Sequence, residues 1–213
     1  MGISQIINEY IENYGQPEDD LLTELTRETA LTQIHPRMIC GNYQGQLLSM
    51  LVKLSMSENI LEIGTFSGYS TICMARALPE KGKITTIEIN DEIQWLSSKY
   101  FYLAKQENKI KAIVGDALEI IQKLNQQFDF VYIDGDKRQY CDYYNIVFPF
   151  VKTGGIILAD NVLWDNKIFD NVVSNDFMTK GIIRFNDMIK NDGKIEKIIL
   201  PLRDGLMLIR KIK

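Results

Sequence analysis

The segment LEIGTFSGYST, from Leu61 to Thr71, decides the fold of this chain. It joins a short apolar run that begins at Asn59 to a glycine-containing turn, and then to a helical pattern that continues to Leu78. A strand, a glycine turn and a helix in this order are typical of the first half of a parallel βαβ unit. The segment therefore predicts an α/β protein.

The same alternation of strand-like runs and amphipathic segments continues along the chain. The runs are rich in Ile and Val with little polar alternation, as expected when helices cover both faces of a parallel sheet. The last two runs are joined by Asp204-Gly205, a strong hairpin signal, so we expect the final strand to be antiparallel. The strand-like runs occupy residues 59–64, 83–89, 109–115, 128–134, 154–160, 195–202 and 205–212.

Helical spacing of apolar residues dominates before residue 58 and between the strands. Three helices are expected at the N-terminus, the second beginning after Pro17 and the third following Pro36. No repeat or linker divides the chain, so we expect one domain, 1–213, with an N-terminal helical cap over 1–57 and an α/β core over 58–213. Further helices are predicted at residues 67–78, 91–108, 117–124 and 140–151.

Composition excludes several classes of function. The chain has 213 residues, with 24 Lys and Arg against 28 Asp and Glu, and its net charge of -4 argues against a nucleic-acid partner. No apolar stretch approaches a membrane span and the N-terminus has no basic flank, so we expect a cytoplasmic protein without a membrane partner. Its 3 cysteines fit neither a disulfide framework nor a zinc motif. The only histidine, His35, is expected to be structural.

Acidic residues follow four of the expected strands. Glu88, Asp116, Asp134 and Asp160 each stand at or just after the carboxyl end of a run. Ligands of open parallel sheets bind outside these ends, so four acids there predict a site. The alternative is that some of them only cap helices or form turns.

The turn after the first strand indicates the kind of ligand. A dinucleotide fingerprint needs glycine at position 66 so that a pyrophosphate can approach, and Phe66 blocks that approach. Glu88 lies 24 positions after Gly64, where an acid commonly holds the ribose hydroxyls. These features favour a nucleoside without phosphates, such as S-adenosylmethionine. Alternatively, Gly64 and Gly68 only allow close packing and Glu88 is solvated.

A second group of residues suits a hard cation. Asp134, Asp160 and Asn161 supply oxygen ligands of the kind that Mg²⁺ prefers, and two hydroxyls of a vicinal diol could take further positions. Lys137, three residues after Asp134, is a candidate general base for such a hydroxyl. The alternatives are turn-forming aspartates without a metal and an ordinary surface lysine.

Taken together and in order, these motifs resemble the cation-dependent class I O-methyltransferases of the catechol and caffeoyl-CoA type. The resemblance covers nearly the whole chain and implies a Rossmann-like fold of seven strands with extra N-terminal helices. It also implies a small phenolic acceptor and a homodimer. The motifs are LEIGTFSGYST (61–71), TIEIN (86–90), VGDA (114–117), YIDGDK (132–137) and ADNVLW (159–164).

The resemblance also implies a role for each matching residue. It implies a divalent cation, Mg²⁺ with Mn²⁺ and Ca²⁺ as alternatives, held by Asp134, Asp160 and Asn161, and Lys137 as the catalytic lysine. It implies an acceptor wall at Trp164 and Asp165. The positions that match cofactor contacts are Met38, Glu62, Gly64, Ser70, Glu88, Asp116, Ala117 and Asp136.

Two departures leave the choice of acceptor open. The plant caffeoyl-CoA enzymes carry Asn-Gly where this chain has Asp165-Asn166, and Thr where it has Cys40. Two other functions are compatible with parts of this pattern. A catalytically silent S-adenosylmethionine-binding or scaffold protein could keep the fold without methyl transfer. A nucleotide-dependent oxidoreductase would have to place a pyrophosphate against Phe66 and would make no use of the cation ligands.

Overall fold

A seven-stranded sheet forms the centre of the computed structural model, which describes residues 3–170 and 172–213. The strand order is β3-β2-β1-β4-β5-β7-β6, and every neighbouring pair is parallel except those that involve β7. The predicted α/β fold with an antiparallel last strand is confirmed. The strands are β1 (Asn59–Ile63), β2 (Lys83–Glu88), β3 (Ile110–Val114), β4 (Phe128–Ile133), β5 (Val151–Ala159), β6 (Ile195–Leu200) and β7 (Leu206–Lys211).

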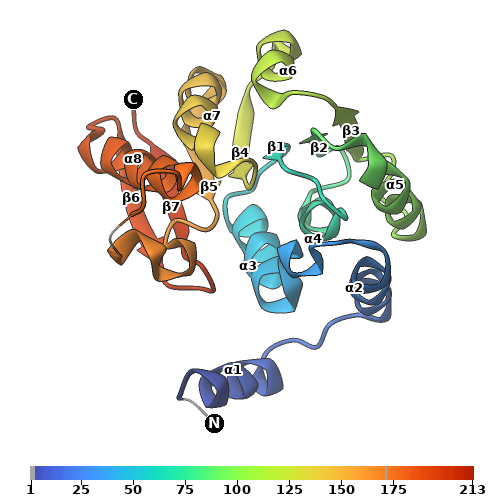
Figure 1. Ribbon diagram of the computed structural model, residues 1–213. Helices are drawn as coiled ribbons and strands as arrows, with labels where there is room; N and C mark the ends of the chain where they lie inside the picture. Colours follow the sequence, from blue (N-terminus) through green and yellow to red (C-terminus); the bar gives the residue numbers. More distant parts are fainter. Residues whose placement is uncertain (1–2, 171) are drawn as a thin grey trace.

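Helices cover both faces of the sheet (Figure 1). Buried apolar residues of α6, α7 and α8 pack against one face, and those of α3 and α4 pack against the other, where α2 and α5 extend the layer. The helix α1 lies apart from the sheet, below α3 in Figure 1. The α-helices are α1 (Ile3–Tyr14), α2 (Asp20–Thr32), α3 (Gly41–Leu54), α4 (Tyr69–Ala77), α5 (Gln94–Leu103), α6 (Ala117–Leu124), α7 (Tyr140–Val147) and α8 (Phe177–Asn191).

Two predicted helices need correction, and one helix was not predicted. The helix expected over 140–151 ends at Val147, because Pro149 cannot continue it and the chain turns through a short 3-10 segment, Phe148–Phe150, into β5. The helix expected over 91–108 begins as a 3-10 turn and ends at Leu103, before a left-handed residue, Lys105. The helix α8 was not among the predicted elements. No helix among the described residues is long and apolar enough to cross a bilayer.

The order of the sheet brings the ends of its central strands together. β1 lies between β2 and β4, so the chain crosses over in opposite directions on either side of it, and a crevice forms where the connections separate. Gly64, directly after β1, has φ +98, and a Cβ there would lie 2.3 Å from the main-chain oxygen of Asp134. Only glycine allows β1 to end this close to β4.

Candidate active site

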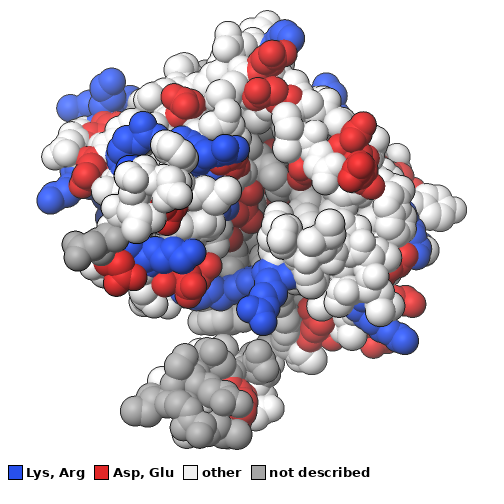
Figure 2. Space-filling model, in the orientation of Figure 1, with Lys and Arg blue, Asp and Glu red and all other residues white. Residues whose placement is uncertain are grey.

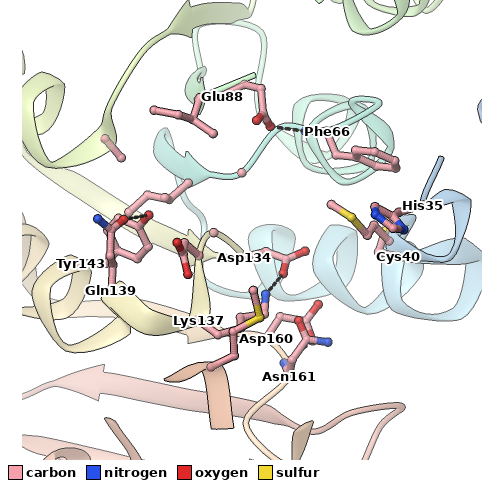
Figure 3. A pocket seen from close by; sticks show the side chains of 18 of the residues that line it. His35, Cys40, Phe66, Glu88, Asp134, Lys137, Gln139, Tyr143, Asp160 and Asn161 are labelled. Carbon is pink, nitrogen blue, oxygen red and sulfur yellow. Dashed lines mark hydrogen bonds and ion pairs between the residues drawn. The ribbon is translucent and has the colours of Figure 1, made fainter. Parts of the chain in front are cut away.

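A cavity of about 850 Å³ opens at the carboxyl ends of β1 to β5. Figure 2 shows this face of the molecule hollowed at its centre, with acidic side chains inside the hollow and basic ones at its edge. Figure 3 shows the lining side chains at close range. Most of the predicted site residues line it: Met38, Gly64, Glu88, Asp116, Ala117, Asp134, Asp136, Lys137, Asp160, Asn161 and Trp164.

Three predicted residues are not part of this lining. Glu62 is fully buried, and its carboxylate accepts hydrogen bonds from the hydroxyls of Ser70, at 2.6 Å, and Thr71. Burial raises the pKa of Glu62 to about 7, against the opposing effect of these hydrogen bonds. Asp165 is exposed, in a left-handed conformation with φ +51. The structure thus places Glu62 and Ser70 behind the cavity wall and Asp165 beside it.

At the β2 end of the cavity, Glu88 shapes the turn after β1. Its Oε2 accepts a hydrogen bond from the Phe66 N–H at 2.8 Å, drawn in Figure 3, and its Oε1 accepts one from the Asn90 N–H at 3.0 Å. Phe66 itself has φ +47 and lines the cavity. Glu88 therefore fixes the turn and faces the cavity, instead of being a freely solvated side chain.

Asp116 and Asp136 also serve as caps. Asp116 accepts a hydrogen bond from the Leu118 N–H at 2.8 Å at the start of α6. Asp136 caps the 3-10 turn Lys137–Gln139 and forms an ion pair with Arg138, which lowers its pKa. Both acids line the cavity as well as capping, so the capping role does not exclude a further role in a site.

Lys137 is held in the cavity wall by Asp134. Its Nζ donates to Asp134 Oδ1 at 2.7 Å, and the residue is only 8% exposed, so the surface-lysine alternative is wrong. Burial alone would lower the pKa of Lys137, but the Asp134 carboxylate raises it well above its usual value. Nζ also lies 5.1 Å from the ring centre of Tyr140 and 6.0 Å from that of Trp164.

Asp160 and Asn161 complete an oxygen-rich corner beside this pair, as Figure 3 shows. Asp160 is 5% exposed, and its Oδ1 accepts a hydrogen bond from the Asn161 N–H at 2.7 Å. Asn161 has φ +57, and its amide nitrogen donates to Asp204 Oδ2 at 3.4 Å, which leaves the amide oxygen as the free acceptor. Burial raises the pKa of Asp134 against the opposing charge of Lys137, and the charge of Asp160 adds to the rise.

This corner fits a hard divalent cation. The buried carboxylate of Asp160 and the partly buried carboxylate of Asp134 converge there with the amide oxygen of Asn161. These are the hard oxygen donors that such a cation prefers. Among the described residues, no group of three or more His, Cys, Asp or Glu has the arrangement of a metal site. Asp134, Asp160 and Asn161 do not form such a group, because only two of them are acidic and the third contributes an amide oxygen.

Two residues that line the cavity, Arg203 and His35, were not predicted as site residues. Arg203, in the β6–β7 turn, lines the cavity and donates to the main-chain oxygens of Ile39, at 3.0 Å, and Cys40. It thereby ties the turn to the segment before α3. The turn had been identified from Asp204-Gly205 only as a hairpin signal. His35, expected to be structural, also lines the cavity.

Comparisons with known proteins agree on one family. The sequence model of a family described as O-methyltransferase matches residues 12–212. The chain is 35% identical to caffeoyl-CoA O-methyltransferase 2 of Populus trichocarpa, over 86% of this chain and 79% of that protein. It is 32% identical to catechol O-methyltransferase of Niastella koreensis, over 94% and 91%.

Solved structures are similar over their whole length. An O-methyltransferase from Bacillus cereus in complex with S-adenosylhomocysteine matches with a TM-score of 0.89 and 28% identity, covering 97% of both chains. The O-methyltransferase TomG from Streptomyces achromogenes, in complex with S-adenosylmethionine, matches with a TM-score of 0.90 and 26% identity, covering 100% of both.

Proposed function

Because this chain belongs to the O-methyltransferase family, we propose that it transfers the methyl group of S-adenosylmethionine to one hydroxyl of a small phenolic vicinal diol, with the help of a divalent cation. One observation carries this proposal. A single cavity joins a nucleoside-type end at Glu88 to an oxygen-rich corner at Asp134, Lys137, Asp160 and Asn161. The names of the relatives, which include caffeoyl-CoA and catechol enzymes, support the choice of acceptor class.

The β1–β2 end of the cavity would hold the cofactor. S-adenosylmethionine supplies an electrophilic methyl group on a positively charged sulfur. Glu88, fixed by the N–H groups of Phe66 and Asn90, would accept the ribose hydroxyls. Phe66 fills the space that a pyrophosphate needs, which suits a nucleoside and argues against the oxidoreductase alternative. Further cofactor contacts are proposed for Met38, Gly64, Asp116, Ala117 and Asp136, which line the cavity, with Glu62 and Ser70 supporting its wall from behind.

Asp134, Asp160 and Asn161 would hold the cation, with Mg²⁺ the preferred choice and Mn²⁺ or Ca²⁺ as alternatives. A divalent cation there would acidify a phenolic hydroxyl and orient it. The three residues come from the ends of β4 and β5, which are parallel neighbours in the sheet. The pairing of these two strands therefore fixes the main-chain positions from which the three side chains extend.

Lys137 would handle the proton of the reacting hydroxyl. Its ammonium is stabilised by Asp134, and an Asp134 carboxylate that also serves as a cation ligand stabilises that ammonium less. With its ammonium less stabilised, Lys137 would be a better acceptor for the proton of a hydroxyl beside it. Burial and the ion pair hold Nζ in place, so that positioning supplies much of the rate enhancement.

Trp164 would form an aromatic wall for the acceptor ring. Its ring lies next to Lys137 Nζ, so a phenol stacked on it presents its hydroxyls toward the oxygen-rich corner. Asp165 follows it in the same strained loop, with successive left-handed residues from Trp164 to Asn166, and we propose that it borders the acceptor. Side chains of this loop would therefore select among acceptors.

The proposal is tested by mass-detected methyl transfer to matched acceptors. S-adenosylmethionine is supplied with catechol, caffeate or a caffeoyl thioester, and in parallel with the corresponding rings that lack one hydroxyl. Product on the diols and at most traces on the single phenols are expected. Cofactor binding without product on any acceptor would instead favour the silent S-adenosylmethionine-binding protein.

We also propose a cytoplasmic homodimer. Exposed apolar side chains lie on α1, including Ile7 and Tyr10, and on α3, including Met50 and Leu54. Such unpartnered faces favour association with a second copy. The 3 cysteines are free thiols, as suits a reducing compartment. Light scattering at several protein concentrations measures the mass, and a constant monomer mass would contradict the dimer.

A further inference from the structure

Two buried side chains from other elements hold the Asp160 carboxylate. The amide nitrogen of Gln44, on α3, donates to Asp160 Oδ2 at 2.5 Å. The hydroxyl of Tyr132, on β4, donates to the same oxygen at 2.8 Å and accepts a hydrogen bond from Gln44 at 2.9 Å. Gln44 is 1% exposed and Tyr132 is 0% exposed, so both donors are shielded from solvent, whereas Asp160 lines the cavity.

The network decides which oxygen of Asp160 remains available. Oδ2 already accepts two hydrogen bonds, which use both of its lone pairs. Oδ1 accepts one, from the Asn161 N–H at 2.7 Å, and so keeps one lone pair open. The carboxylate therefore offers a single oxygen to a ligand in the cavity.

The position of Gln44 depends on close packing between α3 and α4. The next residue, Gly45, sits where a Cβ would lie 2.8 Å from Cys73 Sγ and 2.9 Å from Tyr69 Cε1, both on α4. The absence of a side chain at Gly45 thus lets α3 approach α4 closely and brings the Gln44 amide within hydrogen-bonding distance of Asp160. Both donors are neutral, so, unlike the Lys137 ion pair with Asp134, they orient the Asp160 carboxylate without cancelling its charge.

We propose that Gln44 and Tyr132 are positioning residues that make Asp160 a one-oxygen ligand and thereby favour Mg²⁺ over Ca²⁺. This inference rests on the proposed cation-dependent function. Mg²⁺ requires near-octahedral geometry with few ligands, whereas Ca²⁺ takes more oxygens and readily accepts both oxygens of one carboxylate. Because two buried donors occupy Oδ2, Asp160 cannot bind a cation through both of its carboxylate oxygens.

The test measures cation affinity directly, without relying on activity. Mn²⁺ binding to metal-stripped protein is followed by electron paramagnetic resonance, with Mg²⁺ and Ca²⁺ as competitors, in wild type, Gln44→Met and Tyr132→Phe. Wild type is expected to prefer Mg²⁺. In each variant the Mg²⁺ affinity should fall about 10- to 100-fold while the Ca²⁺ affinity changes much less, as is typical when an outer partner of a metal ligand is lost.

Tyr140→Phe is the matched control. The Tyr140 hydroxyl is also fully buried and also donates to Asp160, but to its main-chain oxygen at 3.0 Å. Its loss should leave the Mg²⁺ to Ca²⁺ ratio unchanged. Circular dichroism and thermal unfolding show whether each variant is folded. If Gln44→Met does not fold, the Mg²⁺ and Ca²⁺ affinities of the wild type and of Tyr132→Phe still show whether the network sets the preference for Mg²⁺.

The outcomes separate this inference from the function on which it rests. A wild type that binds no Mn²⁺ would overturn the cation site itself, and the inference with it. A wild type that binds Mn²⁺ but prefers Ca²⁺ would overturn the inference alone. So would variants in which both affinities fall equally, or in which neither changes.

Discussion

Lys137 and Asp134 form an ion pair in the cavity wall, with 2.7 Å between Nζ and Oδ1 and only 10% and 23% of their side chains exposed. Such a pair is not an incidental surface contact, because burial costs both charges their hydration. It fixes a cationic nitrogen beside the corner where Asp160 and Asn161 supply oxygens. Several predictions about activity depend on this arrangement.

Replacing Lys137 should affect turnover and spare cofactor binding. Lys137→Met removes the group that handles the proton, so kcat should fall about 100- to 10,000-fold while the Kd of S-adenosylmethionine changes by less than about threefold. Lys167→Met is the control, since its Nζ also lies near the Trp164 ring, at 5.8 Å, but the residue is exposed. An equal loss of cofactor affinity in Lys137→Met would contradict its assignment.

Asp134 and Asp136 should separate cation binding from cofactor binding. The two residues stand two positions apart and line the same cavity, but Asp134 pairs with Lys137 and Asp136 with Arg138. Asp134→Asn removes a direct ligand and should weaken Mn²⁺ binding by more than the roughly 10- to 100-fold typical of losing an outer partner, and Asp136→Asn should leave it unchanged. Calorimetric titration with S-adenosylmethionine should show weaker binding for Asp136→Asn. The reverse pattern would exchange the two roles.

Glu88→Gln should weaken the binding of S-adenosylmethionine. The substitution removes a charged acceptor, and the loss of hydrogen bonds to a charged group should raise the Kd of S-adenosylmethionine about 10- to 100-fold. Glu92→Gln, at an exposed glutamate nearby, should bind as the wild type does. Fluorescence or calorimetric titration gives both constants, and an unchanged Kd in Glu88→Gln would remove Glu88 from the cofactor site.

The sequence predicted the strands and their acids well because both depend on local pattern. Buried parallel strands read as apolar runs, and the acids that follow them come together wherever the sheet is parallel. Glu88, Asp116, Asp134 and Asp160 accordingly line one cavity. The helix α8 also carried a signal, since its buried residues Ile182, Phe185 and Ile189 recur at helical spacing, but it was not recognised.

The supporting residues could not be predicted in the same way. Gln44 meets Tyr132 across 88 positions and Asp160 across 116, and Arg203 reaches Cys40 across 163. Such contacts follow from how helices pack on the sheet, which hydrophobic periodicity does not encode. Glu62 was expected to line the cavity, but as a residue within β1 it is buried behind the wall with Ser70.

Glu62 should make stability depend on pH. Its pKa is about 7 in the folded protein, mainly because of burial, and is ordinary in the unfolded chain. The folded state therefore binds more protons between pH 4.5 and 7, and stability should fall as the pH rises through this range, by up to about 3 kcal/mol for this group. Urea unfolding at pH 5 and pH 7.5 should show this loss in wild type relative to Glu62→Gln. Parallel curves for the two proteins would contradict it.

Gly64→Ala should damage both stability and the site. The new Cβ would lie 2.3 Å from the Asp134 main-chain oxygen, in a backbone with φ +98. The free energy of unfolding should fall by at least about 1 to 3 kcal/mol. Gly193→Ala is the control, because a Cβ there meets nothing within 4 Å. Thermal unfolding of the two variants compares them, and an equal melting temperature would show that the strand ends can separate without cost.

The central claim is that an oxygen-rich corner holding a cation drives methyl transfer to a vicinal diol. The most direct measurement is the initial rate of methyl transfer from S-adenosylmethionine to caffeate or catechol, detected by mass. The rate is measured for metal-stripped wild type and metal-stripped Asp160→Ala, before and after addition of Mg²⁺. We expect no product without cation, restored product with Mg²⁺ in the wild type, and none in Asp160→Ala under either condition. Undiminished product from the metal-stripped wild type in the presence of a chelator would contradict it.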